Sequence, residues 1–238
     1  MACRLEKLGR WHFLPGMKTF LAIDFGSGNI KLAEFEARTD GTLLLHRYAV
    51  VPMESPPESE EEEPDPYAAV NLTLTKLLDE NEIRAKGQEA NYCISSSQVF
   101  AKLLRTPPVE GSKVSQIIMY EAQQNVPFPL EEVQWDYQVL GTAETGELDV
   151  LLMALRTEVV EGFADLSRRH GMKLQIIDGS AAALRNAYMH NYGEPEECVL
   201  LLDIGAKTTN ALFIEGSMFY TRSINIGSQN ITQEFASE

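Results

Sequence analysis

The chain has 238 residues, a formal net charge of −15 and an apolar fraction of 44%. This length is enough for a buried core divided over one or two domains. The acidic balance and the lack of a basic stripe argue against nucleic acid as a partner. No apolar stretch reaches the roughly 18 residues that a membrane-spanning helix needs, so we expect no transmembrane segment.

Three cysteines are scattered without ligand spacing, which is typical of a reducing compartment and predicts neither disulfides nor a structural metal site. Residues 1–16 lack the apolar core of a secretory signal, and we expect a disordered leader. Translation from Met17 and a short amphipathic surface anchor are two alternatives. Seven acids lie in the prolyl run 54–66, which we interpret as a solvated loop.

Hydrophobic patterning predicts strands and helices along the rest of the chain. Asp40-Gly41 is typical of a hairpin turn, Gly171 of a helix end, and the prolyl segment 126–132 of an extended connection. The predicted strands cover 19–24, 30–37, 42–51, 91–95, 99–105, 135–141, 148–156, 173–178, 198–205, 209–216 and 217–227. The predicted helices cover 67–80, 112–125, 157–170 and 179–190, and another begins near Ser228.

One strand–turn–strand pattern occurs twice, as LAIDFGSGNIKLAEFE at 21–36 and as LLLDIGAKTTNALFIE at 200–215. The first strand of each copy ends in Asp-x-Gly, at Asp24 and at Asp203. A carboxylate at a strand end can hold the water shell of a magnesium ion. The glycine lets the chain reverse so that backbone N–H groups point at phosphate oxygens. A single copy is better explained as a tight hairpin, whereas two copies in register favour a clamp for a triphosphate.

The motif DFGSGNIK at 24–31 resembles the first phosphate loop of the actin, sugar-kinase and heat-shock-chaperone superfamily, and DIGAKTTN at 203–210 resembles the second. This resemblance implies that ATP and magnesium are the cofactors. Asp24 and Asp203 would then face the magnesium ion through water. The resemblance also implies that the phosphates are contacted by Gly26, Ser27, Gly28, Asn29, Lys31, Gly205, Ala206, Lys207 and Thr208.

The stretch YEAQQNVPFPLEEVQWDYQVLG at 120–141 is similar to a segment of the PilM family of type IV pilus assembly proteins, as are residues 152–178 and 222–232. The resemblance covers residues 17–238. It implies an ATP-binding cytoplasmic scaffold, peripheral at the inner membrane through a partner. The implied partners are the N-terminal peptide of the membrane protein PilN and other inner-membrane pilus assembly proteins, and self-association stays open.

The fold that this resemblance implies is an actin-like (ribonuclease H-like) α/β ATPase fold with an FtsA-like 1C insertion, truncated at the C-terminus. A groove for the PilN peptide is expected between subdomains 1A and 1C, around residues 100–106 and 112–140. Because subdomain 2B would lie beyond Glu238, this chain alone should bind ATP poorly. The implied division is 17–106 plus 174–195 for subdomain 1A, 107–173 for 1C, and 196–238 for the start of 2A.

The residues for hydrolysis depart from the family pattern. PilM-like chains have an acid where this sequence has Ser180, in the run Asp178-Gly179-Ser180. A hydroxyl can orient water but does not easily accept a proton. Asp178 is either the catalytic acid or a helix cap, so we expect nucleotide binding with slow or absent turnover. The alternatives are an FtsA-like cell-division protein or a sugar or acetate kinase of the same superfamily.

Overall fold

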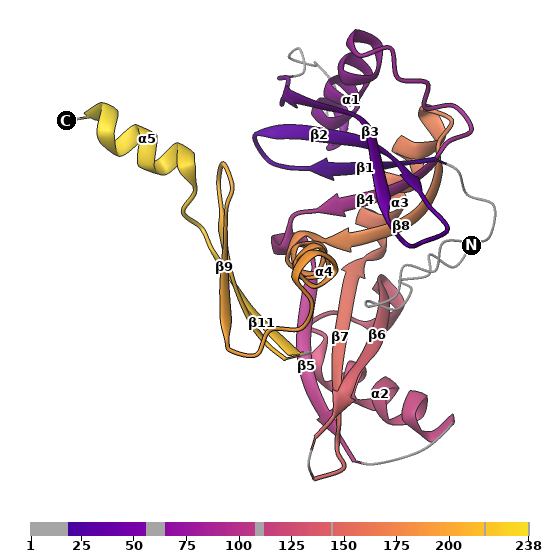
Figure 1. Cartoon of the computed structure of the whole chain (residues 1–238), viewed down its shortest axis with the longest axis vertical. Coiled ribbons are helices and arrows are strands. Elements are labelled where there is room, and N and C mark those ends of the chain that lie inside the picture. Colours follow the sequence, from indigo (N-terminus) through magenta and orange to yellow (C-terminus); the bar gives the residue numbers. More distant parts are fainter. Residues whose placement is uncertain (1–18, 56–64, 108–111, 144, 217, 238) are drawn as a thin grey trace.

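The computed structural model describes residues 19–55, 65–107, 112–143, 145–216 and 218–237. The leader 1–16 and most of the acidic run lie outside the described residues. The described chain forms three β-sheets with helices packed against them, except for the last helix, α5 (Ser228–Ser237), which has no buried residue and projects away from the sheets (Figure 1). None of its described helices is long and apolar enough to cross a membrane.

The strands are β1 (Phe20–Phe25), β2 (Asn29–Ala37), β3 (Leu43–Pro52), β4 (Glu89–Ile94), β5 (Phe100–Thr106), β6 (Val133–Thr142), β7 (Leu148–Arg156), β8 (Lys173–Gly179), β9 (Val199–Ile204), β10 (Thr209–Glu215) and β11 (Met218–Ile224). The α-helices are α1 (Ala68–Glu80), α2 (Ser112–Asn125), α3 (Thr157–Arg169), α4 (Ser180–Tyr192) and α5 (Ser228–Ser237), and two short 3₁₀ turns are η1 (Ser96–Gln98) and η2 (Leu130–Glu132).

The large sheet has the strand order β3-β2-β1-β4-β8. Its first three strands form an antiparallel meander, while β4 and β8 run parallel to β1. Two helices bury their apolar stripes against one face, α1 through Leu74 and Leu77, and α3 through Phe163 and Leu166. The ring of Phe163 lies 4.9 Å from that of Phe25, so α3 is embedded in this core.

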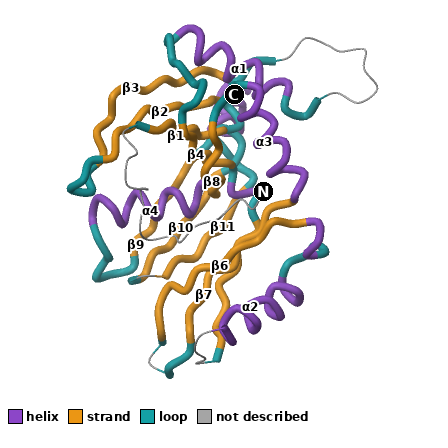
Figure 2. The backbone as a smooth tube through the Cα atoms, turned by 90° about the vertical axis from the view of Figure 1, so that its right-hand side faces the viewer, coloured by secondary structure: helices purple, strands orange, loops and turns teal. Residues whose placement is uncertain are grey.

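The small sheet, with the order β5-β7-β6, packs against α2 through Ile118 and Ala122. The third sheet, with the order β11-β10-β9, packs against α4. Strand β7 contacts both helices because its alternating residues point to opposite faces: Leu152 contacts the α2 cluster, and Leu151 the α4 cluster. Figure 2 shows α4 crossing in front of the strands, and α2 against the side of the small sheet.

The order of elements predicted from the sequence is confirmed throughout the described residues. The hairpin at Asp40-Gly41 is confirmed as well: Gly41 has a φ of +86°, and the Asp40 carboxylate accepts the N–H of Thr42. The extended connection over 126–132 is corrected in one respect. Residues Leu130–Glu132 form a 3₁₀ turn that is closed by a hydrogen bond from Glu132 N–H to the Pro129 carbonyl.

The subdomain boundaries at residues 106 and 173 remain a prediction. Strand β5, placed with subdomain 1A, pairs with β7 in the small sheet. Helix α3, placed with the 1C insertion, packs into the core of the large sheet instead. The part of the chain that forms the small sheet therefore runs from β5 to β7.

Candidate functional site

The two repeated Asp-x-Gly turns have the same backbone hydrogen bond. In the first turn, Gly26–Asn29, the N–H of Gly26 donates to the carbonyl of Asn29 at 3.1 Å. In the second turn, Gly205–Thr208, the N–H of Gly205 donates to the carbonyl of Thr208 at 2.9 Å. A Cβ added to Gly26 would lie 2.9 Å from the carbonyl oxygen of Asn29, and a Cβ added to Gly205 would lie 2.9 Å from that of Thr208. Both turns therefore require glycine at their first position, which explains the sequence repeat.

The two turns meet although about 180 residues of chain separate them. A Cβ added to Gly28 would lie 2.7 Å from the Cβ of Ala206, so the first and second turns face each other at contact distance. The structure thus brings together the two motifs that the sequence repeat predicted to form one clamp.

Lys31 connects the two aspartates electrostatically. Its Nζ donates to Oδ2 of Asp24 at 2.8 Å. This hydrogen bond raises the pKa of the Lys31 ammonium, and the negative charges of Asp24 and Asp203 raise it further against the opposing effect of burial. Both carboxylates thus act on one ammonium group, as expected if they lie on the same side of the molecule.

A row of polar residues crosses the large sheet at this edge. Asp24, Cys93 and Asp178 occupy directly opposite positions on β1, β4 and β8. Burial raises the pKa of Asp178 to about 6, although the Gly179 N–H donates to its Oδ1 at 2.8 Å. Burial and the neighbouring carboxylates raise the pKa of the Cys93 thiol. The thiol therefore stays protonated at neutral pH and is a poor nucleophile.

Ser180 is the first residue of α4 and lies beside η1. Its Oγ is 2.8 Å from Oγ of Ser96 and accepts the N–H of Ser96 at 3.2 Å. The N–H of Ala181 in turn donates to Oγ of Ser96 at 2.8 Å, so Ser96 caps the helix from another segment of the chain. The same hydroxyl of Ser180 is 3.5 Å from Nδ2 of Asn210 on the third sheet.

The start of α5 holds the second turn from outside. The N–H groups of Ser228 and Gln229 donate to the carbonyls of Gly205 and Ala206 at 2.9 and 3.0 Å. Gly227 packs so closely that an added Cβ would lie 2.4 Å from the Ala206 carbonyl oxygen. The conformation of the second turn is therefore set partly by the residues that follow β11.

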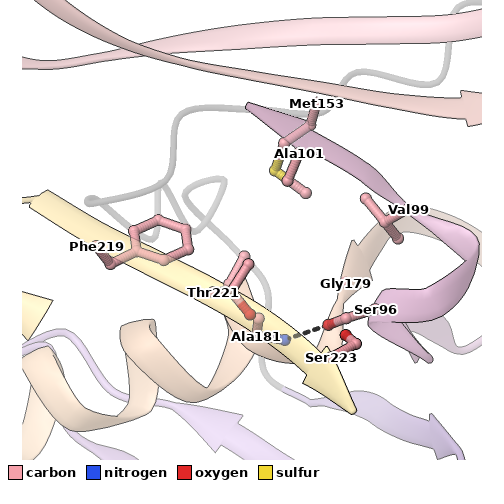
Figure 3. Close-up of a pocket in the computed structure, with 10 residues that line it drawn as sticks. Ser96, Val99, Ala101, Met153, Gly179, Ala181, Phe219, Thr221 and Ser223 are labelled. Atoms are coloured by element: carbon pink, nitrogen blue, oxygen red, sulfur yellow. Dashed lines mark hydrogen bonds between the residues drawn. The ribbon is translucent and has the colours of Figure 1, made fainter. Parts of the chain in front are cut away.

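A small pocket lies between α4, β5 and β11, next to the hydroxyl groups of Ser96 and Ser180 (Figure 3). One part of its wall is polar, with Ser96 and Ser223, and another part is apolar, with Met153 and Phe219. None of the residues that the sequence assigned to phosphate or metal lines this pocket. It is adjacent to the site that the turns form, not part of it.

The predicted site residues are thus gathered at one place, and two more residues there escaped the sequence-based assignment. These are Ser96 and Asn210, both in hydrogen-bond contact with the site. Asn210 is the last residue of the DIGAKTTN motif, and Ser96 lies in a serine run after β4, so each had a weak signal. Among the described residues, no group of three or more His, Cys, Asp or Glu side chains is placed to hold a metal ion directly.

The residues present fit a magnesium–phosphate group. Two carboxylates and one ammonium offer charge complementary to a metal and a phosphate chain. After the closing hydrogen bond of each turn, the N–H groups of its inner residues, such as Ser27 and Lys207, remain as donors for phosphate oxygens. The N–H groups of Gly26 and Gly205 themselves are engaged in the turns, so these two glycines contribute shape.

Comparisons with known proteins show what the chain resembles. It is 24% identical over 170 residues to the type II secretion system protein L of Xanthomonas campestris pv. campestris, covering 71% of this chain and 40% of that protein. A chain of the PilM-PilN type IV pilus biogenesis complex superposes with a TM-score of 0.74 at 23% identity, over 92% of this chain and 65% of that chain.

A Bacteroides thetaiotaomicron protein with an actin-like ATPase fold superposes with a TM-score of 0.50 at 9% identity, covering 96% of this chain and 78% of that chain. The likeness to these structures shows an actin-like ATPase fold. The chain spans less than two thirds of the length of both the secretion protein and the chain from the pilus complex. The family described as "Type IV pilus assembly protein PilM" matches residues 22–238, and the chain therefore belongs to the PilM family.

Proposed function

We propose that the protein is an actin-like, ATP-binding scaffold of type IV pilus assembly that recruits the cytoplasmic N-terminal peptide of PilN at the inner membrane. The observation that carries the nucleotide part is the meeting of the two turns at Gly28 and Ala206, with Lys31 beside them. Family membership and the likeness to the PilM-PilN complex support the pilus part.

In this proposal each site residue has one task. Asp24 and Asp203 hold the water shell of magnesium, and Lys31 leaves its hydrogen bond with Asp24 to contact phosphate. The inner N–H groups of both turns donate to phosphate oxygens, as backbone nests do. Bound magnesium neutralises charge on the phosphate chain of ATP. Gly28 keeps the first turn close enough to the second for both to reach one ligand.

We expect turnover to be slow or absent. The Ser180 hydroxyl is committed to Ser96 and cannot act as a base near neutral pH. With its pKa raised to about 6, Asp178 has a proton affinity suited to general-base chemistry. Its Oδ1 already accepts the N–H of Gly179, so we expect the site to hold nucleotide rather than hydrolyse it.

The proposed peptide site lies on the small sheet, around β5 and the α2–β6 segment, residues 100–106 and 112–140. Strands β5 and β6 are the two edges of this three-stranded sheet, and an edge strand can pair with an extended peptide. Phe128, in the segment between α2 and β6, is 39% exposed, and the Arg156 guanidinium lies 5.4 Å from its ring centre. Such an exposed aromatic suits a partner contact.

A binding experiment tests both parts. The first measurement is capture of a synthetic peptide that carries the N-terminal residues of PilN, by the wild type and by Phe128→Ala. The matched control is Tyr192→Ala, which removes an exposed aromatic side chain at the end of α4, outside the proposed peptide site. We expect the wild type and the control to capture the peptide and Phe128→Ala to capture it weakly. If the wild type does not capture the peptide, the recruitment proposal is contradicted.

The second measurement is the affinity for ATP with magnesium, at ATP concentrations high enough for the poor binding that we expect of this chain alone. We expect Asp24→Asn and Asp203→Asn to abolish the magnesium dependence, because each removes a carboxylate from the metal's water shell. Equal affinities with magnesium and with a chelator in the wild type would refute the proposed metal site.

A second candidate is the same scaffold role in a type II secretion machine, which the similarity to the secretion protein L favours. Co-purification from cells distinguishes the two. Pilus assembly proteins in the bound fraction support the first candidate, and secretion proteins in their place support the second.

A further inference from the structure

Asn210 is a buried polar residue at the centre of the third sheet. It lies on β10 directly opposite Asp203 of β9 and directly opposite Ser223 of β11. Its side chain is 5% exposed. Directly opposite residues on neighbouring strands present their side chains on the same face, so the three residues form one row that ends at the proposed metal-facing carboxylate.

The hydrogen bonds of Asn210 leave its amide one orientation. Nδ2 donates to Oδ2 of Asp203 at 3.1 Å, and Oδ1 accepts the hydroxyl of Ser223 at 2.6 Å. A carboxylate can only accept, whereas a hydroxyl can donate, so exchanging the amide nitrogen and oxygen would place two acceptors together at Asp203. Asp203 therefore sets the direction of the amide, and the Ser223 hydroxyl holds the amide oxygen in place, so that the amide in turn fixes one oxygen of the carboxylate.

The same amide reaches out of its own sheet. Nδ2 lies 3.5 Å from Oγ of Ser180, at the start of α4, and α4 follows directly on β8 of the large sheet. Nδ2 carries two hydrogens, so it has one for the carboxylate and one for the hydroxyl. Asn210 is thus placed to hold the second aspartate in register with the half of the site that the large sheet supplies.

We propose that Asn210 is the positioning residue of this site: it orients the Asp203 carboxylate towards the metal and ties it to Ser180, and Ser223 acts through Asn210. The inference rests on the proposed function, because it takes Asp203 as the residue that holds the magnesium water shell. Groups that orient a metal-facing ligand typically change metal affinity by about 10–100-fold when they are removed. A loss of this size separates positioning from a residue that only fills space.

The first experiment compares the affinity for ATP in magnesium with the affinity in a chelator. We expect Asn210→Ala to weaken binding about tenfold in magnesium and to leave binding in the chelator unchanged. Asn210→Asp should weaken it further, because it replaces the donor with a second negative charge next to Asp203. The matched control is Asn191→Ala, which removes an exposed amide that bonds a carbonyl of its own helix. An equal loss with and without magnesium would show a structural role and overturn the proposal.

The second experiment tests whether Ser223 acts through Asn210. Ser223→Ala alone should weaken magnesium-dependent binding, and Ser223→Thr, which keeps a hydroxyl, should restore it. In the Asn210→Ala background, Ser223→Ala should have no further effect, since the group that it orients is gone. Independent, additive losses from the two substitutions would overturn the proposed order of action.

A third measurement needs no nucleotide and separates failure of this inference from failure of the proposed function. In an NMR experiment, the Nδ2 hydrogens of Asn210 should exchange with water far more slowly than those of Asn191. Ser223→Ala should accelerate the exchange of the Asn210 hydrogens, while the backbone spectrum remains that of the folded protein. If the wild type binds no ATP but shows this protection, the nucleotide part of the proposed function fails, while the orientation of the Asp203 carboxylate by Asn210 stands. Exchange as fast as that of Asn191 would end the inference whatever the nucleotide result.

Discussion

Replacing Gly28 by alanine is the sharpest test of the contact between the first and second turns. The new Cβ would lie 2.7 Å from the Cβ of Ala206, whereas carbon atoms in contact prefer about 3.5–4.0 Å. The turns must therefore separate by about 1 Å, the difference between these distances. Overpacking of this kind costs about 1–3 kcal/mol, and we expect the low end because both residues are only half-buried and can yield.

The compensating change Ala206→Gly removes the colliding methyl group and supplies the matched control. Urea unfolding of the wild type, both single variants and the double variant gives the coupling between the two positions. We expect Gly28→Ala to lose about 1 kcal/mol and the double variant to recover most of it. Magnesium-dependent ATP binding should follow the same pattern. Additivity of the two substitutions within about 0.5 kcal/mol would show that the turns do not touch, and would refute the clamp.

Three further outcomes follow from features of the fold. Gly227→Ala should lower the melting temperature and accelerate amide exchange in α5, because its Cβ would lie 2.4 Å from a carbonyl oxygen of the second turn; unchanged exchange would contradict this packing. The raised pKa of Asp178, about 6 when folded and about 3.9 when unfolded, means that the folded state holds the proton more tightly. Stability relative to Asp178→Asn should therefore be highest below about pH 4 and fall by up to about 3 kcal/mol as the pH rises through 6, and a flat difference in urea unfolding would disprove it. Tyr92→Phe removes the buried acceptor of the Ser167 hydroxyl, 2.6 Å away, and should cost about 1–2 kcal/mol, while Tyr120→Phe, on an exposed side chain, should cost nothing measurable in the same assay.

Local pattern predicted the elements of this fold well because most of its signals are local. The alternation of apolar residues, the glycine after α3 and the Asp40-Gly41 turn each depend on residues a few positions apart. The repeat of Asp-x-Gly made the two turns of the site predictable for the same reason. Each turn needs glycine for its own hydrogen bond, as the short approach to Asn29 and Thr208 shows.

The parts that local pattern missed depend on contacts between distant segments. The partner of strand β5 is β7, about 45 residues further on. Ser96 caps a helix that begins 84 residues later. The 3₁₀ turn at Leu130 escaped notice because a proline restricts the residue before it and says little about the residues after it. Such pairings are decided by tertiary register, which no single window of sequence contains.

Strand β7 passes into α3 without a loop: the strand ends at Arg156 and the helix begins at Thr157. Phe163 and Leu166 of that helix are embedded in the core of the large sheet. Tension applied to the small sheet is therefore transmitted along the main chain of β7 directly to α3 and to this core. A partner pulling on this surface would meet mechanical resistance from the whole large sheet, with no slack connection to absorb the load.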